Sequence, residues 1–286
     1  MSERADRPAL RASVLRGLLL APVGPLDRLE VVERVGSTNT DLADALARDP
    51  GAWPGVGLLV ADHQDGGHGR AGREWTTPPR TALTLSLSMW PTQPLGALTW
   101  LPLLAGLGAA HALRATTGVA ATLKWPNDLL VPAPDGAELE GWGRARKVGG
   151  ILSELVTTPA GPAVVLGIGV NVSQTLQELP VPSAISLAVA GARDVDREVL
   201  LVALVTALAD LEGRWRAAGK IAAGGLADEV TAVCATIGQF VRVALPGGGE
   251  LVGRALRLGP DGSLVVADQA GVERVVLAGD VVHLRA

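Results

Sequence analysis

The sequence changes character near residue 235, and this change constrains the fold more than any other feature. Up to that point, apolar segments with helix-like and strand-like spacing follow one another. Beyond it there are only short Val/Leu/Arg segments separated by glycine-rich turns. Strands spaced by about ten residues with such turns are typical of a small five-stranded barrel. We therefore predict an α+β chain with an N-terminal arm (1–28), a body (29–235) and a terminal β-barrel (236–286).

Apolar periodicity predicts the elements of the body. Thr38 followed by Asp41 is a weak N-cap signature, so we expect a helix from Ser37-Thr38 to about Arg48. Further helices are expected over 98–117 and about 196–217. Apolar runs, alternating or continuous, predict strands at 29–35, 56–61, 82–90, 119–125, 147–156 and 163–172.

Composition excludes several classes of protein. With 286 residues, 48% of them hydrophobic and 19% charged, the chain buries a core without disulfides and is not disordered. The single cysteine, Cys234, excludes a disulfide framework and a cysteine-based zinc site. A net charge of −4 argues against a general nucleic-acid coat. The histidines show no metal-binding spacing: His63, His68, His111 and His283.

No segment is expected to span a membrane. The most apolar windows, 95–113 and 198–211, are too short or too interrupted by Gly, Pro and charge. Residues 1–28 resemble neither a convincing signal peptide nor a winged-helix domain, for which they are too few. We expect a soluble, cytoplasmic protein that does not bind DNA.

A glycine-rich loop at 62–75 is the first candidate site. Its four glycines let the backbone approach a ligand and turn amides toward an anion, and Arg70 and Arg73 offer forked donors for phosphate or carboxylate. Trp75 offers a face for a flat ring. The 62–75 loop is neither a Walker A loop nor a Rossmann fingerprint. A solvated hairpin loop without a binding role would have a similar composition.

Three strand ends carry further candidates. Lys124–Asp128 closes a strand with Lys-Trp-Pro-Asn-Asp, Lys147–Leu152 opens one with a lysine and two glycines, and Gly167–Asn171 ends one with small residues and an amide. Singly, these are equally typical of an ordinary turn, an edge strand and a β-bulge. Yet two of the three asparagines of the chain and two of its three lysines fall in these segments, and the third asparagine, Asn39, lies at the start of the first predicted helix.

Taken in order, these segments resemble the biotin–protein ligases over about 29–286. The resemblance implies a mixed-sheet catalytic domain like that of class II aminoacyl-tRNA synthetases and a C-terminal SH3-like barrel. The matching motifs are Ser-Thr-Asn at Ser37–Asn39, the Gly-Arg-rich adenylate loop at 64–75, Lys-Trp-Pro-Asn-Asp at Lys124–Asp128, Lys-x-x-Gly-Ile-Leu at Lys147–Leu152, and Gly-x-Gly-x-Asn at Gly167–Asn171.

The resemblance implies a two-step ligase. Biotin and ATP, with Mg²⁺, give biotinyl-5′-AMP and pyrophosphate, and the biotinyl group then passes to one lysine of a biotin carboxyl carrier protein. Lys147 and Arg70 would be catalytic, neutralising the carboxylate and the α-phosphate. Biotin would contact Ser37, Thr38, Asn39, Gln64, Gly67, His68, Gly69, Arg70 and Lys147. ATP and the adenylate would contact Arg70, Arg73, Trp75, Lys124, Asn127 and Asn171.

The sequence departs from the family pattern at two places. His68 stands where most relatives have arginine, so we expect a looser hold on the adenylate. Residues 77–82 replace the usual Gly-Asn/Gly-Leu-Tyr pattern, which puts the detailed wall of the pocket in doubt. The glycine content of the 64–75 loop predicts mobility with ordering on binding.

Other functions fit parts of this pattern. A lipoate or octanoate ligase shares the fold, but the Gly-Arg-rich loop and terminal barrel favour biotin. A non-catalytic biotin or adenylate sensor, or an RNA-binding module using the basic loop, is the non-enzymatic alternative. The acidic balance and the single aromatic residue of the loop count against RNA. Neither the oligomeric state nor the carrier follows from the sequence.

Overall fold

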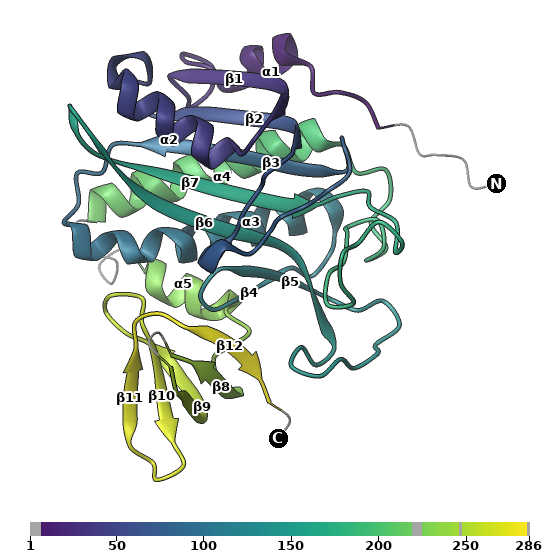
Figure 1. Cartoon of the computed structure of the whole chain (residues 1–286), viewed down its shortest axis with the longest axis vertical. Helices are drawn as coiled ribbons and strands as arrows, with labels where there is room; N and C mark the ends of the chain where they lie inside the picture. Colours follow the sequence, from purple (N-terminus) through teal and green to yellow (C-terminus); the bar gives the residue numbers. More distant parts are fainter. Residues whose placement is uncertain (1–6, 219–224, 246–247, 285–286) are drawn as a thin grey trace.

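A computed structural model describes residues 7–218, 225–245 and 248–284 (Figure 1). Parts of four expectations lie outside the described residues: 1–6 of the predicted arm, 219–224 of the predicted body, Pro246-Gly247 of a predicted turn, and the last two residues of the predicted barrel.

The body is built on one seven-stranded sheet in the order β1-β2-β3-β7-β6-β5-β4. β1 and β2 pair in parallel and all other neighbours are antiparallel, so the sheet is mixed, as predicted. The strands are β1 (Arg28–Val35), β2 (Gly57–Gln64), β3 (Ala82–Met89), β4 (Thr122–Lys124), β5 (Asp128–Pro132), β6 (Ala145–Thr158) and β7 (Gly161–Asn171).

Helices cover both faces of this sheet. α3 and α4 pack together on one face, and α2 lies on the other (Figure 1). Leu42 and Leu46 of α2 pack in one apolar cluster with strand residues that face α2. Strand residues that point to the opposite face belong to the larger cluster, which includes α3 and α4. The helices are α1 (Ala12–Leu19), α2 (Thr38–Arg48), α3 (Leu101–Thr117), α4 (Arg197–Ala218) and α5 (Leu226–Val233), with short 3₁₀ turns η1 (Pro50–Ala52), η2 (Arg70–Gly72) and η3 (Leu95–Trp100).

The boundaries differ from expectation at several elements. Ser37, not Thr38, caps α2, because its hydroxyl accepts the Thr40 amide while the Thr38 side chain turns away to Gln64. The strand expected at 119–125 shrinks to β4, since the chain first leaves α3 through the left-handed Gly118. β5 and α5 were not predicted.

Among the residues described, one helical stretch, Leu95–Thr117, is long and apolar enough to cross a membrane by length and composition. It has 23 residues, because η3 continues into α3, so the expectation that this window is too short was wrong. However, 61% of its most apolar window is buried inside the fold. The apolar residues of this helix therefore pack mainly in the core of the fold.

The C-terminal segment forms a five-stranded antiparallel sheet in the order β11-β10-β9-β8-β12. Its strands are β8 (Phe240–Ala244), β9 (Glu250–Leu258), β10 (Leu264–Asp268), β11 (Glu273–Val276) and β12 (Asp280–His283). Two indoles of the body anchor it: Trp100 Nε1 donates to Pro260 O at 2.9 Å and Trp125 Nε1 to Gly262 O at 3.0 Å. One apolar cluster contains residues of both sheets, so the core does not divide at residue 235. The domain boundary between 235 and 236 therefore stays a prediction.

Candidate active site

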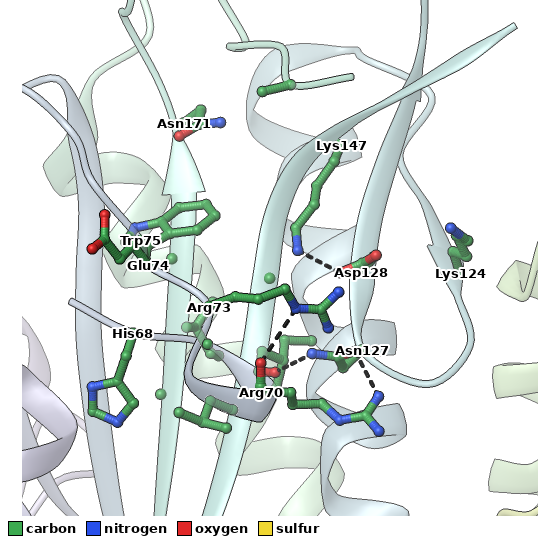
Figure 2. Close-up of a pocket in the computed structure, with 18 of the residues that line it drawn as sticks. His68, Arg70, Arg73, Glu74, Trp75, Lys124, Asn127, Asp128, Lys147 and Asn171 are labelled. Carbon is green, nitrogen blue, oxygen red and sulfur yellow. Dashed lines mark hydrogen bonds and ion pairs between the residues drawn. The ribbon is translucent and has the colours of Figure 1, made fainter. Parts of the chain in front are cut away.

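A cavity of about 370 Å³ opens where the sheet, the 68–76 loop and the C-terminal sheet meet. It gathers residues from all five motif-like segments. Figure 2 labels members of all of them except Ser37–Asn39. Of the residues predicted for the site, those that line it are Ser37, Thr38, Asn39, Gln64, His68, Gly69, Arg70, Arg73, Trp75, Lys124, Asn127, Lys147 and Asn171. Gly67 is the exception; its carbonyl accepts the Trp75 amide at 2.8 Å within the loop.

The side chains that line one end of the cavity, at the start of α2, are uncharged and form a hydrogen-bonding network. The Thr38 amide and hydroxyl both donate to Gln64 Oε1, at 2.7 and 2.8 Å. Ser86 Oγ lies 2.8 Å from the Thr38 hydroxyl and 2.5 Å from Asn39 Oδ1. The Asn39 amide in turn donates to Glu154 Oε2 at 2.7 Å. These groups are therefore held in fixed orientations.

The two glycines of the Gly-x-Gly-x-Asn strand form the floor of the cavity. A Cβ on Gly167 would stand 2.1 Å from Asn39 Oδ1, and one on Gly169 would stand 2.6 Å from the Trp75 ring. Real Cβ atoms do not approach other atoms so closely. The motif thus needs glycine because side chains from other segments lie directly on the strand backbone.

The glycine-rich loop folds back on itself beside this floor. His68 and Glu74 form an isolated antiparallel bridge, and the Gly69 amide donates to Arg73 O at 2.7 Å. Ala71 has a φ of 55°, a conformation in which a β-branched residue would be strained. The indole N–H of Trp75 is buried and has no partner among the residues described.

The loop also contacts the C-terminal sheet. Arg73 Nη2 lies 2.9 Å from Asp280 Oδ1, at the start of β12. Arg70 Nη1 donates to Gly279 O at 3.4 Å and to Asn127 Oδ1 at 3.3 Å. The C-terminal sheet therefore forms part of the wall of the cavity.

The other end of the cavity is cationic on balance, because its four basic side chains outnumber the two aspartates beside them. Lys147 Nζ lies 2.5 Å from Asp128 Oδ1, and both side chains are largely buried (Figure 2). Lys124 is 5% exposed and its ammonium sits 4.1 Å from the centre of the Trp142 ring. Burial lowers the pKa of Lys124, and burial likewise lowers the pKa of Arg70. An anion bound here would relieve the cost of holding these charges away from water.

The two asparagines at strand ends brace the backbone. Asn127 Nδ2 donates to Ile151 O at 2.7 Å, across to the Gly-Ile-Leu segment. Asn171 Nδ2 donates to Ile185 O at 3.1 Å, while its oxygen accepts from Gln174 at 2.9 Å. Both amides line the cavity but already have partners within the chain.

Several residues around the site were not selected from the sequence. Asp128 stands inside a motif that was recognised, so its position was a usable signal. Ser86, Glu154, Trp142 and Asp280 gave no such signal, because only the folded sheet brings them to the cavity or to its side chains. Within the described ranges, no group of three or more His, Cys, Asp or Glu residues is placed to hold a metal.

Comparison with known proteins identifies the class of this fold and site. The sequence model of the Biotin/lipoate A/B protein ligase family matches residues 31–171, and that of the Biotin protein ligase C terminal domain matches 236–284. Both matches indicate the class of biotin and lipoate protein ligases.

Similar individual proteins narrow this class to the biotin ligases. The biotin–acetyl-CoA-carboxylase ligase of Mycobacterium tuberculosis is 38% identical, over 98% of this chain and 97% of its own length. The bifunctional ligase/repressor BirA of Bacillus spizizenii is 28% identical, over 77% of this chain and 64% of its own. The Aquifex aeolicus biotin protein ligase, solved with biotin and ATP, is 25% identical with a TM-score of 0.71, covering 91% of this chain and all of that one. The chain belongs to the biotin protein ligase family, which is a family of enzymes.

Proposed function

We propose that the chain activates biotin with ATP as biotinyl-5′-AMP and transfers the biotinyl group to one lysine of a biotin carboxyl carrier protein. The observation that carries this proposal is the division of one cavity into a neutral hydrogen-bonding end and a cationic end. A ureido ring needs the first, and a carboxylate meeting a triphosphate needs the second. The Aquifex aeolicus relative solved with biotin and ATP, and the name of the mycobacterial relative, support the same proposal.

The neutral end suits the biotin ring. Ser37, Thr38, Asn39 and Gln64 would satisfy the ureido oxygen and N–H groups, and the Gly67–Arg70 backbone would cover the tail and carboxylate. The bonds between Thr38, Gln64, Ser86 and Asn39 orient these groups before the ligand arrives. Preorganised partners lower the entropic cost of binding.

The cationic end suits adenylation. A biotin carboxylate oxygen would attack the α-phosphorus of ATP, and the bond from that phosphorus to the leaving pyrophosphate would break. Lys147 would neutralise the carboxylate and the α-phosphate, and Arg70 would close over the same atoms. Arg73 and Lys124 lie on the same side and would hold the remaining phosphate charge. Asn127 and Asn171 would keep the strand ends around the nucleotide in place.

Magnesium fits this site as an ion delivered with the nucleotide. Mg²⁺ is commonly held by one or two carboxylates together with substrate phosphates, and it keeps several waters. Asp128 offers one carboxylate beside the cationic end, and the described residues offer no three-residue cage. The ion would add positive charge at the phosphates.

In the second step, the carrier lysine attacks the carbonyl carbon of the adenylate, AMP leaves, and the amine loses its proton. That lysine must arrive neutral, since an ammonium has no free electron pair. The C-terminal sheet adjoins the cavity through Asp280, Val281 and Val282, so we infer that it helps to seat the carrier. ATP and such carriers occur together in the cytoplasm, where we expect the enzyme to act.

Biotinylation of an isolated apo-carrier domain tests this proposal. With ATP, Mg²⁺ and biotin, intact mass spectrometry should show one added biotinyl group. A carrier whose acceptor lysine is replaced by arginine should gain none. Modification of that control carrier at the same rate would contradict specific transfer.

A further inference from the structure

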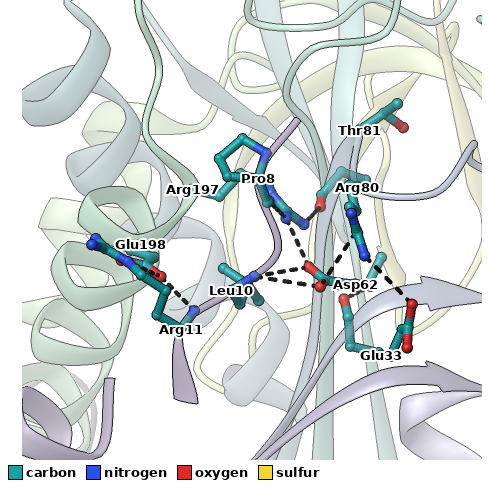
Figure 3. A network of polar contacts seen from close by, with 12 residues as sticks. Pro8, Leu10, Arg11, Glu33, Asp62, Arg80, Thr81, Arg197 and Glu198 are labelled. Carbon is teal, nitrogen blue, oxygen red and sulfur yellow. Dashed lines mark hydrogen bonds and ion pairs between the residues drawn. The ribbon is translucent and has the colours of Figure 1, made fainter. Parts of the chain in front are cut away.

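A buried ion pair joins the start of α4 to β2, next to Pro8 and Leu10 of the N-terminal segment (Figure 3). Arg197, the first residue of α4, is 7% exposed, and Asp62 of β2 is 5% exposed. Arg197 Nη2 donates to Asp62 Oδ1 at 2.7 Å and to Pro8 O at 2.5 Å. Its Nη1 donates to Ala82 O at 3.2 Å.

Asp62 and Ala82 stand at the two ends of the connection between β2 and β3, residues 65–81, which contains most of the glycine-rich loop. Asp62 precedes Gln64, where the loop leaves β2, and Ala82 is the residue with which β3 begins. One guanidinium thus connects both ends of the segment 65–81. The Arg80 amide closes the same stem by donating to Asp62 O at 2.9 Å.

The N-terminal segment completes this connection. The Leu10 amide lies 3.3 Å from each Asp62 carboxylate oxygen. Arg7 donates to Ser173 O at 3.0 Å and pairs with Glu178 at 2.7 Å, directly after the strand end that carries Asn171. Residues 7–11 therefore join the loop stem to a second segment beside the cavity.

Neither charged side chain of the pair lines the cavity, so any effect on a ligand passes through the backbone. A buried charge that loses its partner is strongly destabilised, which makes the paired geometry the preferred one. The guanidinium fork also fixes direction, because its donors point to Asp62, Pro8 and Ala82 from a single plane.

We propose that Asp62 and Arg197, with the backbone of residues 7–11, are positioning residues that hold the 65–81 loop in its ligand-binding arrangement. The consequence for catalysis rests on the proposed function, whereas the consequence for loop geometry does not. In the ligation reaction the pair would hold Arg70 and Trp75 over the adenylate without touching it.

The test uses the full-length chain with Asp62→Asn and Arg197→Gln, and with Arg197→Lys as the conservative variant. Arg214→Gln is the matched control, because Arg214 lies on the same helix and pairs with Glu229 away from the cavity. The first measurement is the initial rate of trypsin cleavage after Arg70 and Arg73 without ligand, located by mass spectrometry. The second is the dissociation half-life of biotinyl-5′-AMP and the KM for biotin.

We expect Asp62→Asn and Arg197→Gln to speed loop cleavage and adenylate dissociation by about tenfold and to raise the KM for biotin similarly. Arg197→Lys should recover part of the loss, since it keeps the charge but not all three bonds. The control should match the parent. Folded variants with parental cleavage rates, adenylate half-life and KM would overturn the proposal.

A third variant keeps the proposal testable if the buried substitutions prevent folding. Arg7→Gln removes the partly exposed link to Glu178 and Ser173 and should raise loop cleavage by about threefold. Parental cleavage in this variant would contradict a role for the N-terminal segment. The proposed function and the positioning role can fail separately. If the parent releases no pyrophosphate with biotin but the variants are cleaved faster, the proposed function is refuted and the positioning role is upheld.

Discussion

The indole of Trp75 lies directly on the backbone of Gly169, so that a Cβ at position 169 would stand 2.6 Å from the ring. Trp75 lies between β2 and β3, whereas Gly169 lies in β7, so β4, β5 and β6 come between them in the sequence. Their contact fixes where the flat face of the ring can meet a ligand. The glycine is therefore a requirement of the site as well as of the strand.

Gly169→Ala should displace the Trp75 ring and raise the KM for ATP by about fivefold, because a stacking face worth about 1 kcal/mol is moved. Steady-state kinetics with ATP varied at saturating biotin measure this. Gly213→Ala, on α4 with open space around it, is the control and should leave the KM unchanged. An unchanged KM in Gly169→Ala would contradict the stacking role.

The contact between Arg73 and Asp280 predicts energetic coupling between the loop and the C-terminal sheet. Both side chains are about half exposed, so their pairing adds little to global stability, on the order of 0–1 kcal/mol. Arg73→Gln and Asp280→Asn should each weaken ATP binding about threefold to tenfold. The double variant should be no weaker than the worse single one, and strictly multiplicative losses would show that the two residues act independently.

His68 predicts a weaker hold on the adenylate than an arginine would give. It is partly exposed, and its Nε2 lies 3.9 Å from Glu154 Oε1. His68→Arg adds a permanent charge at neutral pH, so biotinyl-5′-AMP should dissociate several times more slowly. Release of labelled biotinyl-5′-AMP after dilution into excess unlabelled biotin and ATP measures this rate. An unchanged rate would contradict the prediction that His68 weakens the hold on the adenylate.

His283 predicts a pH dependence of stability. Burial, with the nearby Lys124 charge, lowers the pKa of His283 from 6.5 to about 4. Between these values the unfolded chain binds a proton that the folded chain does not. Stability is therefore complete above about pH 6.5 and falls as the pH drops toward 4, by up to about 3 kcal/mol.

His283→Gln removes this contribution while keeping a group that can bond the Thr236 hydroxyl, 3.2 Å from His283 Nε2. Urea unfolding of parent and variant from pH 7 to 4 isolates the effect as the difference between their slopes. Parallel curves across this range would refute a neutral buried imidazole.

The sequence predicts the chemistry of the site better than its geometry. Five motif segments were recognised from short patterns, and thirteen of the fourteen residues selected from them line one cavity. Gly67 does not line it, because the pattern shows that a glycine is needed but not whether this glycine faces a ligand or bonds to the Trp75 backbone within the loop.

Contacts between distant segments account for what was not predicted. Trp142 comes from a Pro-rich and acidic connector with no motif, yet its ring covers Lys124. Asp280 follows an ordinary turn, and only the packing of the C-terminal sheet brings it to Arg73. β5 was not predicted because it is a five-residue strand following Pro126, where a turn is the local expectation.

Biotin-dependent pyrophosphate release with ATP and Mg²⁺ tests the central claim most directly. Biotin, lipoate and no acid are compared in the parent and in Lys147→Ala. We predict release with biotin alone, reduced at least about 100-fold in the variant, because a fixed cation is lost from the reacting carboxylate and phosphate. Release with lipoate but not biotin, release that persists without Lys147, or no release with either acid would contradict the account.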